Sequence, residues 1–241
     1  MVLQIPRILV RPQAQKWGLR YATTDGGPSM SLQDTSAETS GGGLWQVTLT
    51  AIELISPALR NLWDGFAALQ DGGATPIVMP MFVGLRAPWP VVNGRPVVSS
   101  AIYPHSDGTY FSDGTGYVED VIRSHLVGAR PLRATSVTLH MDYGSEITMG
   151  MHFSIRHSKL GWRLYRVRRV IEATIGTNAG SYNLDVRPPL RQAITGDEEV
   201  VWDTPRCVMR MTDAEQWHQE EEARKFPTPT ITMIERLWSA A

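Results

Sequence analysis

The sequence predicts a mainly β protein, an antiparallel β-sandwich or barrel with one packed helix. Several segments alternate apolar and polar residues with the two-residue period of a half-buried strand, as Tyr182, Leu184 and Val186 do. One segment, residues 57–70, combines a helical period with start and stop signals. Prolines crowd residues 74–104, where they favour short edge strands and loops over central strands.

The composition sets the size class and excludes several partners. With 241 residues, the chain forms one large domain or two small ones. The 23 basic and 24 acidic residues give a net charge of −1, so we expect no sequence-specific nucleic-acid binding and no membrane association. No N-terminal signal or apolar run near 20 residues is found, which predicts a soluble protein made in the cytoplasm and not secreted by itself. Eight tryptophans favour a packed core and protein interfaces.

The first 43 residues are expected to form an N-terminal arm and a flexible loop. Residues 1–20 show no helical period, and residues 22–43 are rich in Thr, Ser, Gly and Asp. A β-rich domain is expected over residues 44–211, beginning with the alternating strand Trp45–Ala51. Residues 212–241 are expected to form a C-terminal helix and tail.

The helix over residues 57–70 has the clearest signals in the chain. Ser56 is expected to cap it, Pro57 suits its first position, and Asp71-Gly72-Gly73 ends it. Its expected apolar face consists of Leu59, Leu62, Trp63, Phe66 and Leu69. We expect Trp63 and Phe66 to anchor the helix to the core.

After the helix, the pattern is mostly β. Residues 77–79 and 81–83 are expected to reach the core between prolines, and the two Asp-Gly pairs at 107 and 113 predict tight turns rather than a calcium loop. Residues 137–141 form one expected strand, and residues 149–155 with 162–175 an antiparallel hairpin. Thr212-Asp213-Ala214-Glu215 has capping-box spacing and predicts a helix over about 213–225, followed by a short amphipathic tail over 231–238.

The residues that carry chemistry do not form a recognisable catalytic, cofactor or metal motif, so we expect none of these sites. Cys207 lies in an apolar run and is expected to be a buried small hydrophobe. His140 and His152 flank the expected hairpin and could approach one another, but three or four convergent ligands are needed for zinc. No nucleophile elbow or phosphate-binding loop is present, although a triad need not be local in sequence.

One basic cluster stands out, on the expected strand after the turn at residues 157–160. Arg163, Arg166 and Arg168 alternate in part with Trp162, Leu164 and Val167. The pattern is typical of a solvated strand face, and the same face is a candidate lumen wall or inter-subunit surface.

The stretch from 180 to 211 carries a resemblance to a known family. An alternating strand is followed by Arg187-Pro188-Pro189-Leu190-Arg191 and then by the strand Pro205–Met211. This layout resembles the C-terminal half of distal-tail and minor tail proteins of long-tailed bacteriophages. The Trp45–Leu49 strand, which feeds a helix ending in Leu69–Gly73, extends the resemblance over residues 44–211.

The resemblance implies a fold related to tail-tube and distal-tail proteins, and a structural virion protein rather than an enzyme. Such a protein is made in the cytoplasm of the host bacterium and becomes part of the virion tail. It forms a homo-oligomeric ring, with a hexamer as the expected form, that joins the tail tube protein to the baseplate hub or other tail-tip proteins. No cofactor is implied.

Five residues are expected to serve structural or inter-subunit contacts: Arg187, Pro188, Pro189, Arg191 and Arg206. The two prolines fix an extended crossing, which would hold Arg187 and Arg191 in place beside a sheet edge. We expect both arginines to make charge-assisted hydrogen bonds within the subunit or to a neighbour.

The alternative reading is a tail-associated carbohydrate-binding module or hydrolase. Four aromatic residues could stack on sugar rings: Tyr103, Tyr110, Phe111 and Tyr117. This reading predicts a monomer that binds glycan, whereas the structural reading predicts self-assembly without a ligand.

Overall fold

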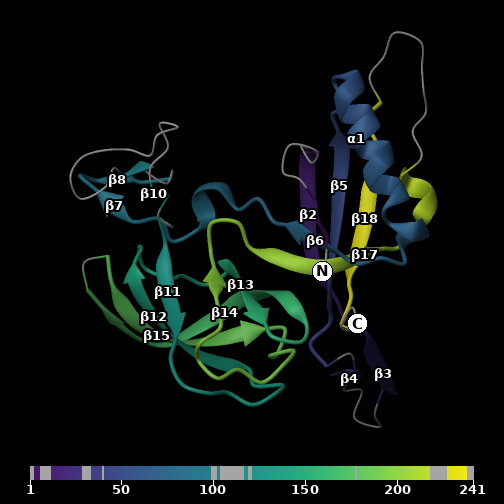
Figure 1. Cartoon of the computed structure of the whole chain (residues 1–241). Coiled ribbons are helices and arrows are strands. Elements are labelled where there is room, and N and C mark those ends of the chain that lie inside the picture. Colours follow the sequence, from purple (N-terminus) through teal and green to yellow (C-terminus); the bar gives the residue numbers. More distant parts are fainter. Residues whose placement is uncertain are drawn as a thin grey trace. The chain divides into compact units, whose positions relative to one another are not determined.

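The computed structural model describes residues 3–5, 12–28, 34–39, 41–98, 102–103, 117–118, 121–176, 178–217 and 227–237. The fold is mainly β, with a half-barrel sheet and a nearly closed barrel sheet (Figure 1). The half-barrel unit comprises Met1–Pro80, Ser158–Leu164 and Arg206–Ala241. The barrel unit comprises Met81–His157 and Tyr165–Pro205.

The half-barrel unit contains a six-stranded sheet whose neighbours are antiparallel, except for the parallel pair β1 and β6. In spatial order the strands are β1 (Leu3–Gln4), β6 (Ile77–Pro80), β17 (Arg206–Met211), β18 (Ile231–Glu235), β5 (Leu44–Ile52) and β2 (Pro12–Arg20). The alternation predicted for β5 is confirmed, because Trp45, Val47 and Leu49 are all fully buried. Cys207 is buried in β17, as expected.

Helix α1 (Pro57–Ala68) confirms the predicted helix and both of its start signals. The Ser56 side chain accepts a hydrogen bond from the backbone N–H of Leu59 at 3.2 Å, and Pro57 occupies the first turn. Trp63 and Phe66 are buried, as predicted. Leu62 and Leu69 are exposed at 41% and 58%, so the buried face is narrower than the periodicity indicated. The helix contacts two 3₁₀ turns, η1 (Asp71–Gly73) and η3 (Ala214–Trp217).

The barrel unit is built on the second six-stranded sheet. Its spatial order is β11 (Arg123–Leu126), β12 (Ser136–Tyr143), β15 (Gly180–Arg187), β14 (Gly161–Ile175), β13 (His152–His157) and β16 (Val200–Val201). Residues 161–164, at the start of β14, belong to the half-barrel unit. The edge strands β11 and β16 contact each other, and the Trp202 indole N–H donates to the Ser124 hydroxyl at 3.0 Å. The Trp202 ring also stacks on Phe153 at 4.8 Å between centroids, which fills the barrel interior.

Three two-stranded hairpins and one more 3₁₀ turn complete the described elements. They are β3 (Thr23–Pro28) with β4 (Asp34–Glu38), β7 (Val91–Val92) with β8 (Arg95–Pro96), β9 (Ile102–Tyr103) with β10 (Tyr117–Val118), and η2 (Gly84–Arg86). None of the helices in the described part of the chain is long and apolar enough to cross a membrane.

Several element boundaries differ from the sequence predictions. The expected hairpin strand 149–155 begins at His152, and Met149 is 75% exposed because it lies in the preceding turn. β6 is an internal strand, between β1 and β17, although prolines nearby predicted an edge. Residues 231–235 form strand β18 rather than an amphipathic tail.

The two units also divide the chain differently from the expected domains 1–43, 44–211 and 212–241. Residues 12–20 of the expected arm pair along β5, and part of the expected loop forms the β3–β4 hairpin. The expected helix 213–225 lies only partly within the described residues. The structure has the 3₁₀ turn η3 over Ala214–Trp217, and residues 218–225 lie outside the described residues. The Asp-Gly turns at 107 and 113 also lie outside them.

Candidate functional site

The candidate site is a cationic groove on one face of the half-barrel sheet. Strand alternation places Lys16, Gly18 and Arg20 of β2 on the same face, since successive side chains in a strand point to opposite sides. In the register of the sheet, these residues lie opposite Thr48, Gln46 and Leu44 of β5. The neighbouring β5 residues Trp45, Val47 and Leu49 point to the buried side. The groove therefore lies on the face that carries polar and charged side chains.

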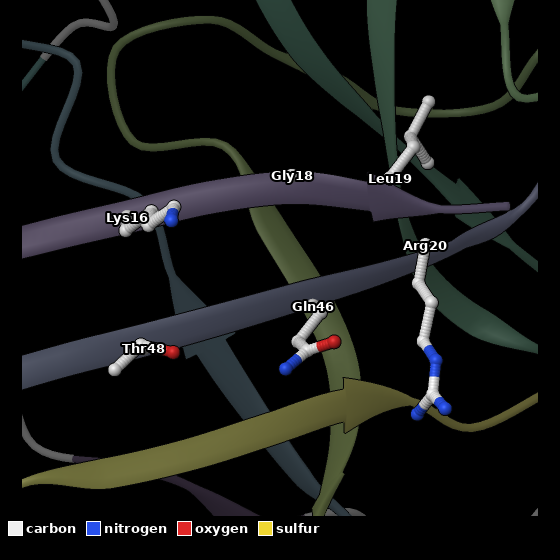
Figure 2. Close-up of a pocket in the computed structure, with 6 residues that line it drawn as sticks. All are labelled: Lys16, Gly18, Leu19, Arg20, Gln46 and Thr48. Atoms are coloured by element: carbon white, nitrogen blue, oxygen red, sulfur yellow. The ribbon is translucent and has the colours of Figure 1, made fainter.

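The first part of the groove is a depression of about 280 Å³. Figure 2 shows its lining along β2 and β5: Lys16, Gly18, Leu19, Arg20, Gln46 and Thr48. The space above Gly18, in the middle of this row, is open, because a Cβ added there would meet no atom within 4 Å. Lys16 and Arg20 flank the open position, with the Gln46 amide and the Thr48 hydroxyl beside it.

A second depression of about 510 Å³ continues across the sheet. It is lined by Leu44, Gly73, Ala74, Arg210, Ile234, Glu235, Arg236 and Leu237. The strand register joins the two, since Gln46 of β5 lies opposite Ile234 of β18, and Ile234 lies opposite Arg210 of β17. We use "cationic groove" for both depressions together.

The positive charge of the cationic groove is not neutralised within the described residues. Lys16 and Arg20 are exposed and make no side-chain hydrogen bond or ion pair to any described residue, and Arg210 donates only to the carbonyl of Met211, at 3.4 Å. The lining acid, Glu235, is 3% exposed and forms a buried ion pair with Arg163. The groove is suited to carboxylate or phosphate oxygens, which guanidinium and ammonium groups bind through charge-assisted hydrogen bonds.

Local sequence patterns did not predict this groove. Its signal was the two-residue spacing of Lys16, Gly18 and Arg20. That spacing marks a surface only once residues 12–20 are known to form a strand with Trp17 and Leu19 on its opposite face.

Arg163 contradicts the prediction of an exposed basic face. The residue is fully buried, and its guanidinium pairs with Glu235 at 3.7 Å and donates to the carbonyls of Leu160 and Arg236. Trp162 and Leu164 are also buried, so the two-residue alternation of exposure fails here. The physical reason is that successive residues of this part of β14 are all buried, so both faces of the strand are covered here.

The other two residues of that expected face, Arg166 and Arg168, lie further along β14, in the part of the strand that belongs to the barrel unit. The Arg168 Nε lies 2.9 Å from the Asp185 carboxylate. Arg166 faces Arg187 of β15 in the strand register. Its expected role at a lumen or between subunits stays a prediction.

Backbone hydrogen bonds help to hold the segment from Arg187 to Arg191 in place. The Arg191 N–H donates to the Tyr165 hydroxyl at 3.1 Å, and that hydroxyl lies 2.7 Å from His157 Nε2. The Leu190 N–H donates to the carbonyl of Ala134 at 2.8 Å. Pro188 is buried, Pro189 is half-buried, and the Arg187–Pro188 peptide bond is cis. The expected contacts of the Arg187 and Arg191 guanidinium groups stay predictions.

Arg206 has an interaction within the half-barrel unit. Its guanidinium carbon lies 5.2 Å from the centroid of the Trp162 ring, a cation–π geometry. This contact orients the side chain at the start of β17, and it leaves the expected inter-subunit role untested.

His152 is the described residue with the largest resolved pKa change. Burial lowers its pKa from 6.5 to about 4, with the positive charges of Arg166 and Arg86 adding to the effect. In the unfolded chain the imidazole is protonated below about pH 6.5, whereas in the folded chain it is protonated only below about pH 4. Between these two pH values the unfolded state therefore binds more protons than the folded state.

We therefore expect the stability of the protein to fall as the pH drops from about 6.5 to 4, by up to roughly 3 kcal/mol from this residue. Urea unfolding at pH 7 and pH 4 would measure the change. His152→Gln, which does not titrate, should lose this part of the pH dependence, and an identical pH profile in the two proteins would contradict the assignment.

The remaining histidine and tyrosine candidates are only partly brought together. His140 approaches His125 rather than His152, with ring centroids 5.2 Å apart, and the Asp142 carboxylate lies 2.9 Å from His125 Nδ1. Within the described ranges, no group of three or more His, Cys, Asp or Glu residues is arranged to hold a metal ion. Tyr103 and Tyr117 are partners in the β9–β10 register, and positions 110 and 111 lie outside the described residues.

Comparison with models of protein families finds no match, and comparison with curated protein sequences finds none either.

Proposed function

We propose that this chain is a structural component of a bacteriophage tail, a ring-forming distal tail protein that joins the tail tube to the baseplate or tail tip. The observation that supports this proposal is the open edge of the half-barrel sheet. Strand β2 has nine residues and ends the sheet, with β5 as its neighbour on one side. On its other side the described part of the chain supplies no strand.

A strand edge of this length needs either a partner strand or a structural feature that prevents pairing with another chain. A free strand edge presents unpaired N–H and C=O groups, which form a template for a strand of another chain. A half-barrel does not satisfy them by closure, whereas subunits of a ring satisfy them by pairing sheet edges head to tail. The resemblance of residues 44–211 to distal-tail proteins points to the same kind of assembly.

Two neighbouring proline substitutions test the edge. In an antiparallel strand, successive residues direct their N–H groups alternately to the two sides, so one of Ala14 and Gln15 donates toward β5 and the other toward the open edge. Ala14→Pro and Gln15→Pro are therefore matched controls for each other. We expect one variant to lose thermal stability and the other to keep it.

The variant that keeps its fold is the informative one. The wild-type chain should have the mass of a ring, expected to be six subunits, in light scattering. The folded variant should need at least a tenfold higher concentration to assemble, because an edge-facing N–H is lost and the proline ring obstructs the neighbouring strand. A ring that assembles equally well would remove β2 as the assembly edge, and a wild-type monomer would contradict the proposed function.

A further inference from the structure

We propose that the cationic groove of one copy binds the acidic turn Asp197–Glu199 of a second copy, an inference that rests on the proposed ring. Two features of the chain support it. The groove has cations that no described residue neutralises, and it lies beside the β2 edge at which the neighbour is proposed to dock. The turn is the longest run of acidic residues in the described part of the chain.

The position of the groove favours a second copy as its occupant. Lys16 and Arg20 belong to β2 itself, so a subunit that pairs along the open edge passes next to both side chains. Arg210 extends the positive charge across the sheet. A neighbour that placed cations here would be repelled, and a neighbour with carboxylates would be attracted.

The acidic turn is held in shape by one of its own residues. The Glu198 carboxylate accepts hydrogen bonds from the N–H groups of Thr195 at 2.8 Å and Gly196 at 2.9 Å. Partial burial works to raise the pKa of Glu198, but these hydrogen bonds outweigh it and lower the pKa. The turn thereby stays formed and charged at neutral pH.

The two outer residues of the turn are available to a neighbour. Asp197 is exposed, and its carboxylate makes no hydrogen bond or ion pair to a described residue. Glu199 is exposed and pairs with Arg156 at 3.4 Å, a surface ion pair that is easily exchanged. Asp197 and Glu199 are two residues apart, so their Cα atoms lie at most about 7 Å from each other. Lys16 and Arg20 lie on either side of Gly18, and their long side chains can reach two carboxylates at this separation.

The proposed contact is also consistent with a closed assembly. Groove and turn lie in the same chain, so every copy carries one of each. A contact between two unlike surfaces is heterologous, and repeated from copy to copy it generates a ring when the rotation closes. The contact would add specificity to edge pairing, whose backbone hydrogen bonds carry little sequence information.

Two charge-reversed full-length chains test the contact. The first, Lys16→Glu with Arg20→Glu, has an acidic groove and an acidic turn. The second, Asp197→Lys with Glu199→Lys, has a basic groove and a basic turn. We expect each chain alone to be monomeric at concentrations where the wild type is a ring, with assembly weakened at least tenfold. An equimolar mixture should recover the wild-type mass, because alternating copies restore opposite charges at each contact.

A matched control reverses two exposed arginines elsewhere, Arg95→Glu with Arg169→Glu, and so makes the same change in net charge as the first chain. This variant should assemble like the wild type. Reversed chains that assemble alone, or a mixture that stays monomeric, would overturn the contact. Rings formed by the reversed chains would leave the proposed function intact. Association of the mixture into pairs or open filaments, with no ring from any chain, would keep the contact and reject the distal-tail role.

Discussion

Replacing Arg163 with alanine is expected to destabilise the half-barrel unit by about 3–5 kcal/mol, the cost of removing one partner of a buried ion pair. The guanidinium is fully buried, lies 3.7 Å from the Glu235 carboxylate and donates to three backbone carbonyls. Its loss removes the cationic partner of the buried Glu235 carboxylate and one donor to each of those carbonyls. The carboxylate still accepts the backbone N–H of Trp45 at 3.1 Å, which does not replace a neutralising charge.

Urea unfolding at pH 7 measures this effect, with Arg156→Ala as the matched control. Arg156 also pairs with a glutamate, Glu199, but both side chains are largely exposed, so its loss should cost about 1 kcal/mol or less. The double variant Arg163→Met with Glu235→Leu should cost less than the sum of the single changes, since both charges of the ion pair are removed together. Equal stability of Arg163→Ala and Arg156→Ala would show that Arg163 is not buried.

Replacing Trp63 with alanine is expected to cost about 3–5 kcal/mol, because it removes a fully buried indole from beneath α1 and leaves a cavity. The tryptophan is one of the largest fully buried side chains in the described part of the chain. Leu62→Ala, at the adjacent and partly exposed position, should cost about 1 kcal/mol or less.

Thermal and urea unfolding of both variants would compare the two faces of the helix. A similar loss for Trp63→Ala and Leu62→Ala would contradict the observed orientation of α1. Phe66→Ala should resemble Trp63→Ala, since Phe66 is the other buried residue of the helix.

Local sequence patterns were sufficient for the elements whose signals lie within a few residues. The Ser56 cap and Pro57 predicted the start of α1, since capping depends on the first turn alone. The alternation of Val137, Leu139 and Met141 predicted a strand with one buried face, and all three side chains are fully buried in β12. The β character of the chain followed from many such segments.

Sheet pairing was beyond the reach of the same patterns. Residues 12–20 were predicted to form part of an arm, because the partner strand β5 cannot be recognised from their own pattern. The contact of Trp17 with Trp45 forms only when β5 lies beside β2. The cationic groove depends on that pairing, and so its residues were missed. The basic residues that did stand out, such as Arg163 and Arg168, have carboxylate partners within their own units.

The sequence by itself determined the fold class, the position of α1 with its two anchors, and the faces of the main strands. Each depends on spacing between near neighbours in the chain, which fixes which side chains share a face. Tertiary structure alone decided that Arg163 is buried and that no residue the structure describes neutralises Lys16 or Arg20. Whether a charge is exposed or paired depends on residues far away in sequence that folding brings together, as Glu235 is brought to Arg163.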